Sequence, residues 1–310
     1  MIYKKSKIFL AGHKGMVGSA IHKKLKQNGF KNIIVISKKK LNLLNQKKVE
    51  KFIIAKKPEI VIIAAARVGG ILANNNYKAN FIYENLMIQT NLIHSSFLGG
   101  VKNLIFLGSS CIYPKNVKQP IKENYFMTGK LEETNDAYSI AKIAGAKMCM
   151  EYSNQYKLNY KTLMPANMFG CNDNYDLKSS HFFPALINKI HHAKLRKNKF
   201  VTIWGNGKPM RELLYVDDFA DACIFFMKKK TKESFINIGS GIEKTIFGYT
   251  KYIIKKLDAK LKIKYDKSKP NGMKRKILDL TISKKYGWKS KTSLDHAFDI
   301  VYSDFVNKLN

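Results

Sequence analysis

The chain has 310 residues and is 45% hydrophobic, so it can bury a full core in one large domain or two modest ones. Its formal net charge is +34, but only four of the 56 basic residues are arginine, the side chain that phosphate and base recognition favours. We therefore expect no specific nucleic-acid partner and interpret the charge as a solvated lysine surface that favours an anionic substrate. No apolar stretch comes near the roughly twenty residues that a membrane span needs, so we expect no membrane partner.

The first half of the chain alternates between strand-like and helical patterns. Apolar, β-branched runs predict strands over residues 7–11, 32–36, 59–65, 103–107 and 160–164. Helical spacing of apolar residues predicts helices over 17–27, 47–56, 75–97 and 139–156. Because near-continuous apolar strands alternate with helices, we predict an α/β fold with a Rossmann-type, doubly wound parallel sheet covered on both faces.

The rhythm changes beyond about residue 165. Residues 171–180 are polar and turn-prone, residues 181–192 and 217–227 have helical spacing, and Gly205-Asn206-Gly207 predicts a hairpin-like region. We therefore expect a Rossmann domain over residues 1–166, with a return segment near 212–240. A smaller, discontinuous α+β substrate-binding domain would occupy residues 167–310.

Glycines follow the first predicted strand in the segment GHKGMVG, residues 12–18. At a strand-to-helix turn they let the backbone approach a pyrophosphate at the helix N-terminus, which indicates a dinucleotide. The second predicted strand ends Val35-Ile36-Ser37-Lys38-Lys39, without the carboxylate that usually holds the ribose 2′-hydroxyl of NAD. Lys38, together with Lys14 inside the loop, suits a 2′-phosphate, so we predict NADP(H) as the cofactor.

Tyr138 and Lys142 form a Tyr-x-x-x-Lys step, which places both side chains on one face of the predicted helix. We expect the ammonium group to lower the pKa of the phenol towards the working range, so that Tyr138 can donate and accept a proton. Ser109, at the end of the fourth strand, would hydrogen-bond a carbonyl that Tyr138 protonates while a nicotinamide delivers hydride. The glycine loop, the serine and the tyrosine–lysine pair, in this order, predict an oxidoreductase.

These ordered motifs resemble the extended short-chain dehydrogenase/reductases, which act on nucleotide sugars. The resemblance runs from about residue 5 to 290 and is carried by GHKGMVGSAI, LNLL, AAARVGGILANN, FIYENLMIQTNLIH, FLGSSCIYPK, AYSIAKIAG, WGNGKPMREL and VDDFADA. It extends to the members that invert C3 and C5 of a 4-keto sugar before they reduce C4. It implies NADPH-dependent conversion of GDP-4-keto-6-deoxy-D-mannose to GDP-L-fucose, by a homodimer that packs through helices near residues 77–97.

Inversion at carbons beside a ketone needs a stabilised enolate oxygen, a base on one face and an acid on the other. Tyr138 and Ser109 suit the oxygen. Cys111 lies two residues after Ser109, so on an extended backbone both side chains would point to the same side, and a thiol close to a cationic site can serve as the base. The resemblance implies that Cys111 is this base and that His181 is the acid.

The resemblance also implies contacts with the cofactor and with the nucleotide sugar. The expected cofactor contacts are Gly12, His13, Lys14, Gly15, Met16, Val17, Gly18, Lys38, Leu107, Gly108, Ser109, Ser110, Lys142, Pro165, Ala166, Asn167, Met168 and His181. The expected substrate contacts are Lys189, Trp204, Arg211 and Asn271. The chain departs from the family pattern at Asn271, where aspartate is usual, at Ala166, where threonine is usual, and at Cys171, where proline is common. None of these departures removes a chemical group from the expected mechanism.

The four cysteines show no C-x-x-C spacing, which predicts reduced thiols in a cytoplasmic protein and no metal site. Cys149, Cys171 and Cys223 are interpreted as small hydrophobic residues. Two other functions remain open. Another nucleotide-sugar 4-reductase or 4-epimerase would leave Cys111 and His181 idle, and a 4-epimerase would be expected to carry an acid at Lys38. A non-catalytic Rossmann protein that binds polyanions would be expected to have a broken Tyr-x-x-x-Lys step.

Overall fold

The computed structural model describes residues 2–269 and 271–309. Its largest element is a six-stranded sheet of order β2-β1-β3-β4-β5-β9, in which every neighbouring pair is parallel. The strands are β1 (Ile8–Ala11), β2 (Ile33–Ile34), β3 (Ile60–Ile63), β4 (Asn103–Leu107), β5 (Asn159–Pro165) and β9 (Phe235–Ile238). β1, β3 and β9 are buried along their whole length, as strands of a sheet covered on both faces must be. The predicted doubly wound α/β fold is confirmed.

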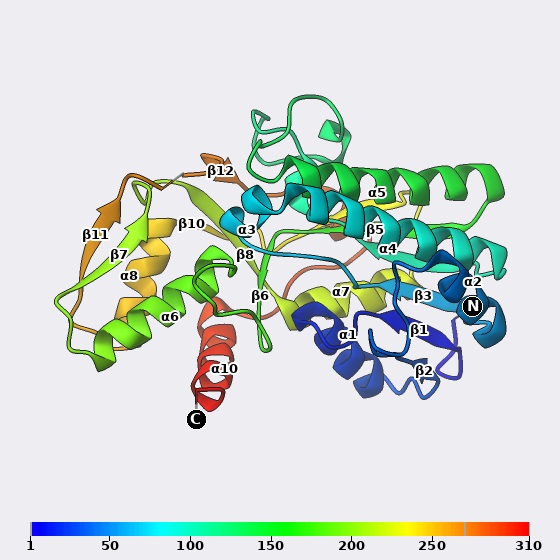
Figure 1. Ribbon diagram of the computed structural model, residues 1–310, viewed down its shortest axis with the longest axis horizontal. Coiled ribbons are helices and arrows are strands. Elements are labelled where there is room, and N and C mark those ends of the chain that lie inside the picture. The colour runs from blue at the N-terminus through cyan, green and yellow to red at the C-terminus, as the bar shows by residue number, and fades with distance from the viewer. Residues whose placement is uncertain (1, 270, 310) are drawn as a thin grey trace.

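Helices cover both faces of this sheet (Figure 1). On one face α4 (Lys78–Leu98) and α5 (Asp136–Tyr156) pack against each other, with α2 (Gln46–Lys56) beside α4. On the other face α1 (Met16–Gln27) packs against α7 (Val216–Lys228). The chain therefore returns to the large sheet after residue 215 and adds α7 and β9 to it.

A smaller lobe stands at one end of the large sheet (Figure 1). Its four-stranded sheet is built around β8 (Met210–Tyr215), which pairs in parallel with β6 (Asn167–Phe169) and β12 (Arg275–Lys276) and antiparallel with β10 (Glu243–Thr245). A separate two-stranded sheet joins β7 (Phe200–Trp204) to β11 (Lys262–Asp266).

The remaining elements of the chain are α3 (Ile71–Asn76), α6 (Phe182–Leu195), α8 (Ile246–Lys256), α9 (Thr281–Lys285), α10 (Leu294–Asn307) and the short 3-10 helices η1 (Ser110–Ile112) and η2 (Glu123–Tyr125).

The predicted hairpin at Gly205-Asn206-Gly207 is wrong. These residues do form a tight turn, because Gly205 and Gly207 both have positive φ. The strands on either side, β7 and β8, nevertheless pair with partners in different sheets. The pairing partner of β7 is about sixty residues away in the sequence, beyond the reach of a local turn signal.

A buried carboxylate ties the strands of the smaller sheet to neighbouring segments. Glu212, in β8, is fully buried and accepts hydrogen bonds from the backbone N–H groups of Gly241 (2.7 Å) and Leu278 (2.9 Å). Burial raises the pKa of Glu212, and these backbone hydrogen bonds oppose that shift. Glu212 therefore holds the segments that follow β9 and β12 against the strand that carries Arg211.

Within the described residues, no helix is long and apolar enough to cross a membrane. The same part of the chain contains no group of three or more His, Cys, Asp or Glu residues placed to hold a metal ion. All four cysteines are free thiols.

Candidate active site

A cleft of about 960 Å³ lies at the carboxyl ends of the parallel strands and continues towards the smaller lobe. Its walls come from the segments that follow β1, β3, β4 and β5, and from residues of β7, β8 and the segment 271–276. Ligands of open α/β sheets bind at this edge. Every predicted site residue lines the cleft except Leu107 and Lys142, which lie behind its wall: the Lys142 Nζ donates a hydrogen bond to the Leu107 carbonyl oxygen at 2.8 Å.

The glycines of the 12–18 loop meet different steric demands. Gly12 has a φ of +90°, and a Cβ there would lie 2.5 Å from the Ala65 nitrogen. A Cβ on Gly18 would lie 2.0 Å from the Gly12 carbonyl oxygen, so the packing around this position leaves no room for a side chain. A Cβ on Gly15 would meet only the Gly12 oxygen, at 3.8 Å, and would otherwise stand in open space.

Gly15 is the N-cap of α1 and provides no side-chain cap, so the first N–H groups of this helix have no side-chain partner among the described residues. Open space at an uncapped helix N-terminus fits a pyrophosphate. Lys14 and Lys38 line the adjoining part of the cleft. The described cleft residues between positions 36 and 44 include no carboxylate, so the residues present fit a dinucleotide with a 2′-phosphate.

Ser109 and Cys111 meet through a turn, and the expectation of an extended backbone is wrong. Ser109 is extended, but it caps the 3-10 helix η1, and its hydroxyl oxygen lies 3.4 Å from the Cys111 backbone nitrogen. The Cys111 Sγ donates to the same oxygen at 3.0 Å. The Ser139 hydroxyl donates to the Cys111 carbonyl oxygen at 3.0 Å and so ties η1 to α5. The thiol and the hydroxyl therefore lie together although the backbone is not a strand.

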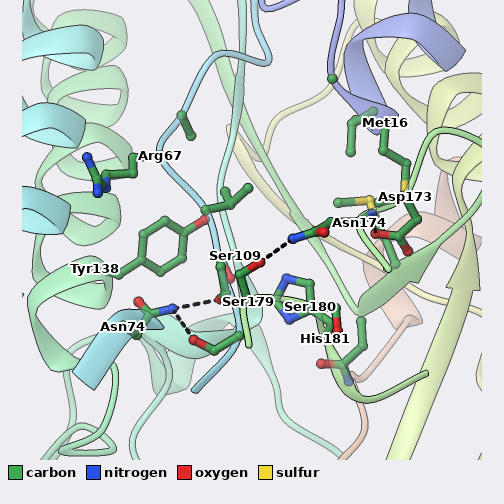
Figure 2. A pocket seen from close by; sticks show the side chains of 18 of the residues that line it. Met16, Arg67, Asn74, Ser109, Tyr138, Asp173, Asn174, Ser179, Ser180 and His181 are labelled. Atoms are coloured by element: carbon green, nitrogen blue, oxygen red, sulfur yellow. Dashed lines mark hydrogen bonds between the residues drawn. The ribbon is translucent and has the colours of Figure 1, made fainter. Parts of the chain in front are cut away.

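Tyr138 stands in the first turn of α5 and lines the cleft near Ser109 (Figure 2). Its pKa is raised above the ordinary value, mainly by burial and also by negative charge on Cys111, while the Ser109 side chain opposes the shift. The expectation that Lys142 lowers the pKa of this phenol is wrong. The Lys142 ammonium lies 5.9 Å from the centre of the Tyr138 ring, is directed at a carbonyl, and has its own pKa lowered to about 8 by burial.

His181 is the N-cap of α6 and opens onto the same cleft (Figure 2). The surrounding protein lowers the pKa of its imidazole by desolvation, and the charge of Lys276 lowers it further. The residue is nevertheless exposed to the cleft, so solvent reaches the ring.

The predicted substrate contacts line the cleft near the smaller lobe. Lys189 lies 5.2 Å from the centre of the Trp204 ring. Arg211 donates through Nη1 to the carbonyl oxygens of Met210 (2.8 Å) and Met273 (2.7 Å), and burial lowers its pKa to about 10. The Asn271 Oδ1 accepts from the Asn206 backbone N–H at 2.9 Å. This end of the cleft offers two cations and an aromatic ring, which suits a nucleoside diphosphate.

Sequence reasoning missed three polar residues of the cleft. Lys276 lies opposite Arg211 in the pairing of β12 with β8, and burial lowers its pKa to about 8. Glu132 is nine-tenths buried and lies 3.6 Å from the Lys115 ammonium. Asn74 is buried in α3 and donates hydrogen bonds to the turn that precedes this helix. No sequence signal marked them, because Lys276 resembles the many other lysines and the contacts of Glu132 and Asn74 depend on the fold.

Comparison with known proteins places this arrangement in a family. The profile of the NAD dependent epimerase/dehydratase family matches residues 8–239. The chain is 46% identical to a GDP-L-fucose synthase of Sinorhizobium fredii, over 98% of this chain and 96% of that protein. It is 43% identical to the GDP-L-fucose synthase of Escherichia coli K12, over 97% of each chain.

Solved structures agree with the sequence matches. A GDP-6-OMe-4-keto-L-xylo-heptose reductase from C. jejuni superimposes with a TM-score of 0.93 at 35% identity, covering 100% of this chain and 99% of that one. A GDP-mannoheptose C4 reductase from Campylobacter jejuni, with NADP bound, gives a TM-score of 0.89 at 37% identity, covering 99% and 100%. The predicted resemblance to nucleotide-sugar enzymes is confirmed, and the chain belongs to the NAD-dependent epimerase/dehydratase family.

Proposed function

We propose that this protein is a GDP-L-fucose synthase, an NADP(H)-dependent enzyme that epimerises GDP-4-keto-6-deoxy-D-mannose at C3 and C5 and reduces it at C4. The observation that carries the proposal is the meeting of Ser109, Cys111, Tyr138 and His181 in one cleft with the glycine loop. The full-length identity to GDP-L-fucose synthases supports the same activity.

The cofactor would lie along the 12–18 loop, with its pyrophosphate at the N-terminus of α1 and its 2′-phosphate near Lys14 and Lys38. When bound, reduced nicotinamide supplies a hydride to C4 of the sugar. Comparison of KM for NADPH and NADH tests the choice of cofactor. A clear NADH preference would refute it, and Lys38→Glu is expected to shift the preference towards NADH.

In the epimerisation, the Cys111 thiolate removes a proton from the carbon beside the ketone, and the electron pair moves onto the C4 oxygen. Tyr138 and Ser109 donate hydrogen bonds to that oxygen and so stabilise the enolate. His181 then delivers a proton to the opposite face of the carbon, which inverts the centre. Exchange with solvent in the cleft restores both groups before the second inversion.

In the reduction, Tyr138 gives its phenolic proton to the C4 oxygen. Its raised pKa keeps the phenol protonated at neutral pH, which is the form that donates. Lys142 holds the Leu107 carbonyl oxygen at the end of β4 and thereby fixes the strand end from which Ser109 follows.

The deciding experiment is incubation of the purified protein with GDP-4-keto-6-deoxymannose and NADPH, with the stereochemistry of the product determined by NMR. We expect GDP-L-fucose. A 4-reduced product with unchanged C3 and C5 would instead support a simple 4-reductase, the second candidate, which the similarity to the two heptose reductases favours. Absence of NADPH oxidation together with salt-sensitive RNA binding would support the polyanion-binding alternative.

The proposal includes a cytoplasmic homodimer that packs through α4 and α5. Its support is apolar exposure on both helices: Tyr83 of α4 is 58% exposed and Ile140 of α5 is 46% exposed. Ile140→Lys is expected to give monomers in light scattering. Ile54→Lys, at a similarly exposed position on α2, is expected to leave the dimer intact.

The division of the chain into a Rossmann domain over residues 1–166, with a return segment near 212–240, and a substrate-binding domain over 167–310 also belongs to the proposal. It is supported by β9, which joins the large sheet, and by the separate sheets of the smaller lobe.

A further inference from the structure

After β3 the chain makes a turn at Gly69 and Gly70, and this turn contacts the segment that carries His181. The Gly70 backbone N–H donates to the Ser179 carbonyl oxygen at 2.7 Å. A Cβ on Gly70 would lie 2.3 Å from the Ser180 carbonyl oxygen. Gly70 has an ordinary negative φ, so the absence of a side chain serves close approach and not an unusual backbone conformation.

Asn74 fixes the position of this turn through two hydrogen bonds. Its side chain is 6% exposed, and its Nδ2 donates to the carbonyl oxygens of Gly69 (2.7 Å) and Gly70 (3.0 Å), as Figure 2 shows. Both partners are acceptors, so only a donor suits this position. The turn therefore cannot retreat from Ser180 without breaking buried hydrogen bonds.

The opposite side of the contact is also held in place. The Ser179 hydroxyl accepts from the Asn174 Nδ2 at 2.8 Å and donates to the Asp176 carboxylate at 2.7 Å. His181 follows Ser180 directly and begins α6, where its carbonyl oxygen accepts from the Ala185 N–H at 3.1 Å. A displacement of the Ser180 carbonyl therefore passes to His181 through one peptide unit.

We propose that Gly70, supported by Asn74, is a positioning residue that sets where the His181 imidazole lies across the cleft from Cys111. This role rests on the proposed function, in which His181 protonates the sugar carbons during epimerisation. It predicts that a side chain at position 70 impairs epimerisation selectively, because Tyr138 and Lys142 stand on α5 and do not depend on the 179–181 segment.

The neighbouring glycine provides a matched comparison. A Cβ on Gly69 would meet the Ala73 Cβ at 2.9 Å and the Phe81 ring at 3.2 Å, whereas the nearest atom of the 179–181 segment is 3.8 Å away. Phe81 packs edge-on against Tyr138, with ring centres 6.3 Å apart. Gly69→Ala therefore presses towards Tyr138, and Gly70→Ala presses towards His181.

The test measures the two half-reactions separately. Epimerisation is followed as deuterium incorporation at C3 and C5 of GDP-4-keto-6-deoxymannose in D₂O without NADPH, and reduction as NADPH oxidation with the pre-epimerised ketone. In Gly70→Ala the new Cβ and the Ser180 carbonyl oxygen must move apart by about 1 Å to reach an ordinary separation. A misplacement of that size at a catalytic group costs roughly a hundredfold in rate. We expect Gly70→Ala to lose about this factor in deuterium incorporation while reduction stays within about threefold of wild type.

Gly69→Ala is expected to lower deuterium incorporation and reduction by similar factors, because it presses towards Tyr138, which acts in both half-reactions. Gly129→Ala, in an exposed loop where the new Cβ meets only the Pro114 side chain at 3.3 Å, is expected to leave both reactions unchanged. If Gly70→Ala does not fold, Asn74→Asp tests the same role, because it keeps the shape and removes both donors. Its deuterium incorporation is expected to fall more than its reduction.

Equal loss of both half-reactions in Gly70→Ala, or in Asn74→Asp where that variant is used, would overturn the positioning role, and so would unchanged deuterium incorporation. A wild-type protein that oxidises NADPH with the pre-epimerised ketone but incorporates no deuterium would overturn the proposed function itself, and this role with it.

Discussion

Alanine substitutions in the 12–18 loop are predicted to separate fold stability from cofactor binding. Gly18→Ala places its Cβ 2.0 Å from the Gly12 carbonyl oxygen, well inside the 3.4 Å at which ordinary contact begins. The backbone must shift by roughly 1.4 Å, and overpacking of this kind costs about 1–3 kcal/mol in the free energy of unfolding. For a chain of this length the loss corresponds to a fall in Tm of about 2–5 °C.

Gly15→Ala makes the same chemical change three residues earlier and meets no atom closer than 3.8 Å. Replacing an N-cap glycine by alanine costs no more than about 1 kcal/mol, so Tm should change little. The new methyl group stands at the uncapped N-terminus of α1, where the pyrophosphate would lie. Loss of one charge-assisted hydrogen bond there, about 1.5–3 kcal/mol, raises the Kd for NADPH by roughly 10- to 100-fold.

Thermal unfolding followed by circular dichroism without cofactor gives the first quantity, and calorimetric titration with NADPH gives the second. Wild-type NADPH affinity in Gly15→Ala would refute the placement of the cofactor. Equal falls in Tm for the two variants would refute the distinction between a packed glycine and an open one.

Four further outcomes are expected. Cys111→Ser should lower epimerisation by about 10²–10⁴-fold while reduction of the pre-epimerised ketone persists, and equal loss of both would contradict the separate roles. Tyr138→Phe should abolish NADPH oxidation at unchanged NADPH affinity; loss of affinity alone would count against a proton-donating role. Glu212→Gln sets a buried amide N–H against a backbone donor and should lower the free energy of unfolding in urea by about 2–4 kcal/mol. Glu243→Gln, at the position paired with Glu212, keeps one oxygen acceptor for the half-exposed Arg275 and should cost less, about 1 kcal/mol. The kcat/KM should fall with ionic strength, because the net charge of +34 attracts two anionic ligands; an unchanged kcat/KM would exclude steering.

The sequence predicted the large sheet well because its strands are buried on both faces. The runs at β1, β3 and β4 are nearly continuous in apolar residues, and burial alone explains them. The smaller lobe was harder, since its strands are short and pair across long stretches of chain. The turn at Gly205–Gly207 was recognised from its glycines, but the partner of β7 is decided by packing that no local pattern encodes.

The residues of the candidate site were predictable where a motif fixes their spacing, as for Ser109 and the Tyr138–Lys142 step. The local physics was less predictable. The path from Ser109 to Cys111 is a 3-10 turn, and the pKa of Tyr138 depends on burial more than on the lysine one helical turn away. Lys276 and Asn74 could not be predicted, because their surroundings come from segments distant in the sequence.

The return of α7 and β9 to the large sheet bears on how this chain can be synthesised and dissected. The edge of β5 is completed by β9 through the pairs from Thr162–Phe235 to Pro165–Ile238. About seventy residues separate β5 from β9 in the sequence. During synthesis the edge of β5 therefore stays unpaired until those residues have left the ribosome, and an unpaired edge can pair with other chains. A gene truncated after codon 166 would encode the same unprotected edge permanently, so it would not yield an autonomous nucleotide-binding fragment.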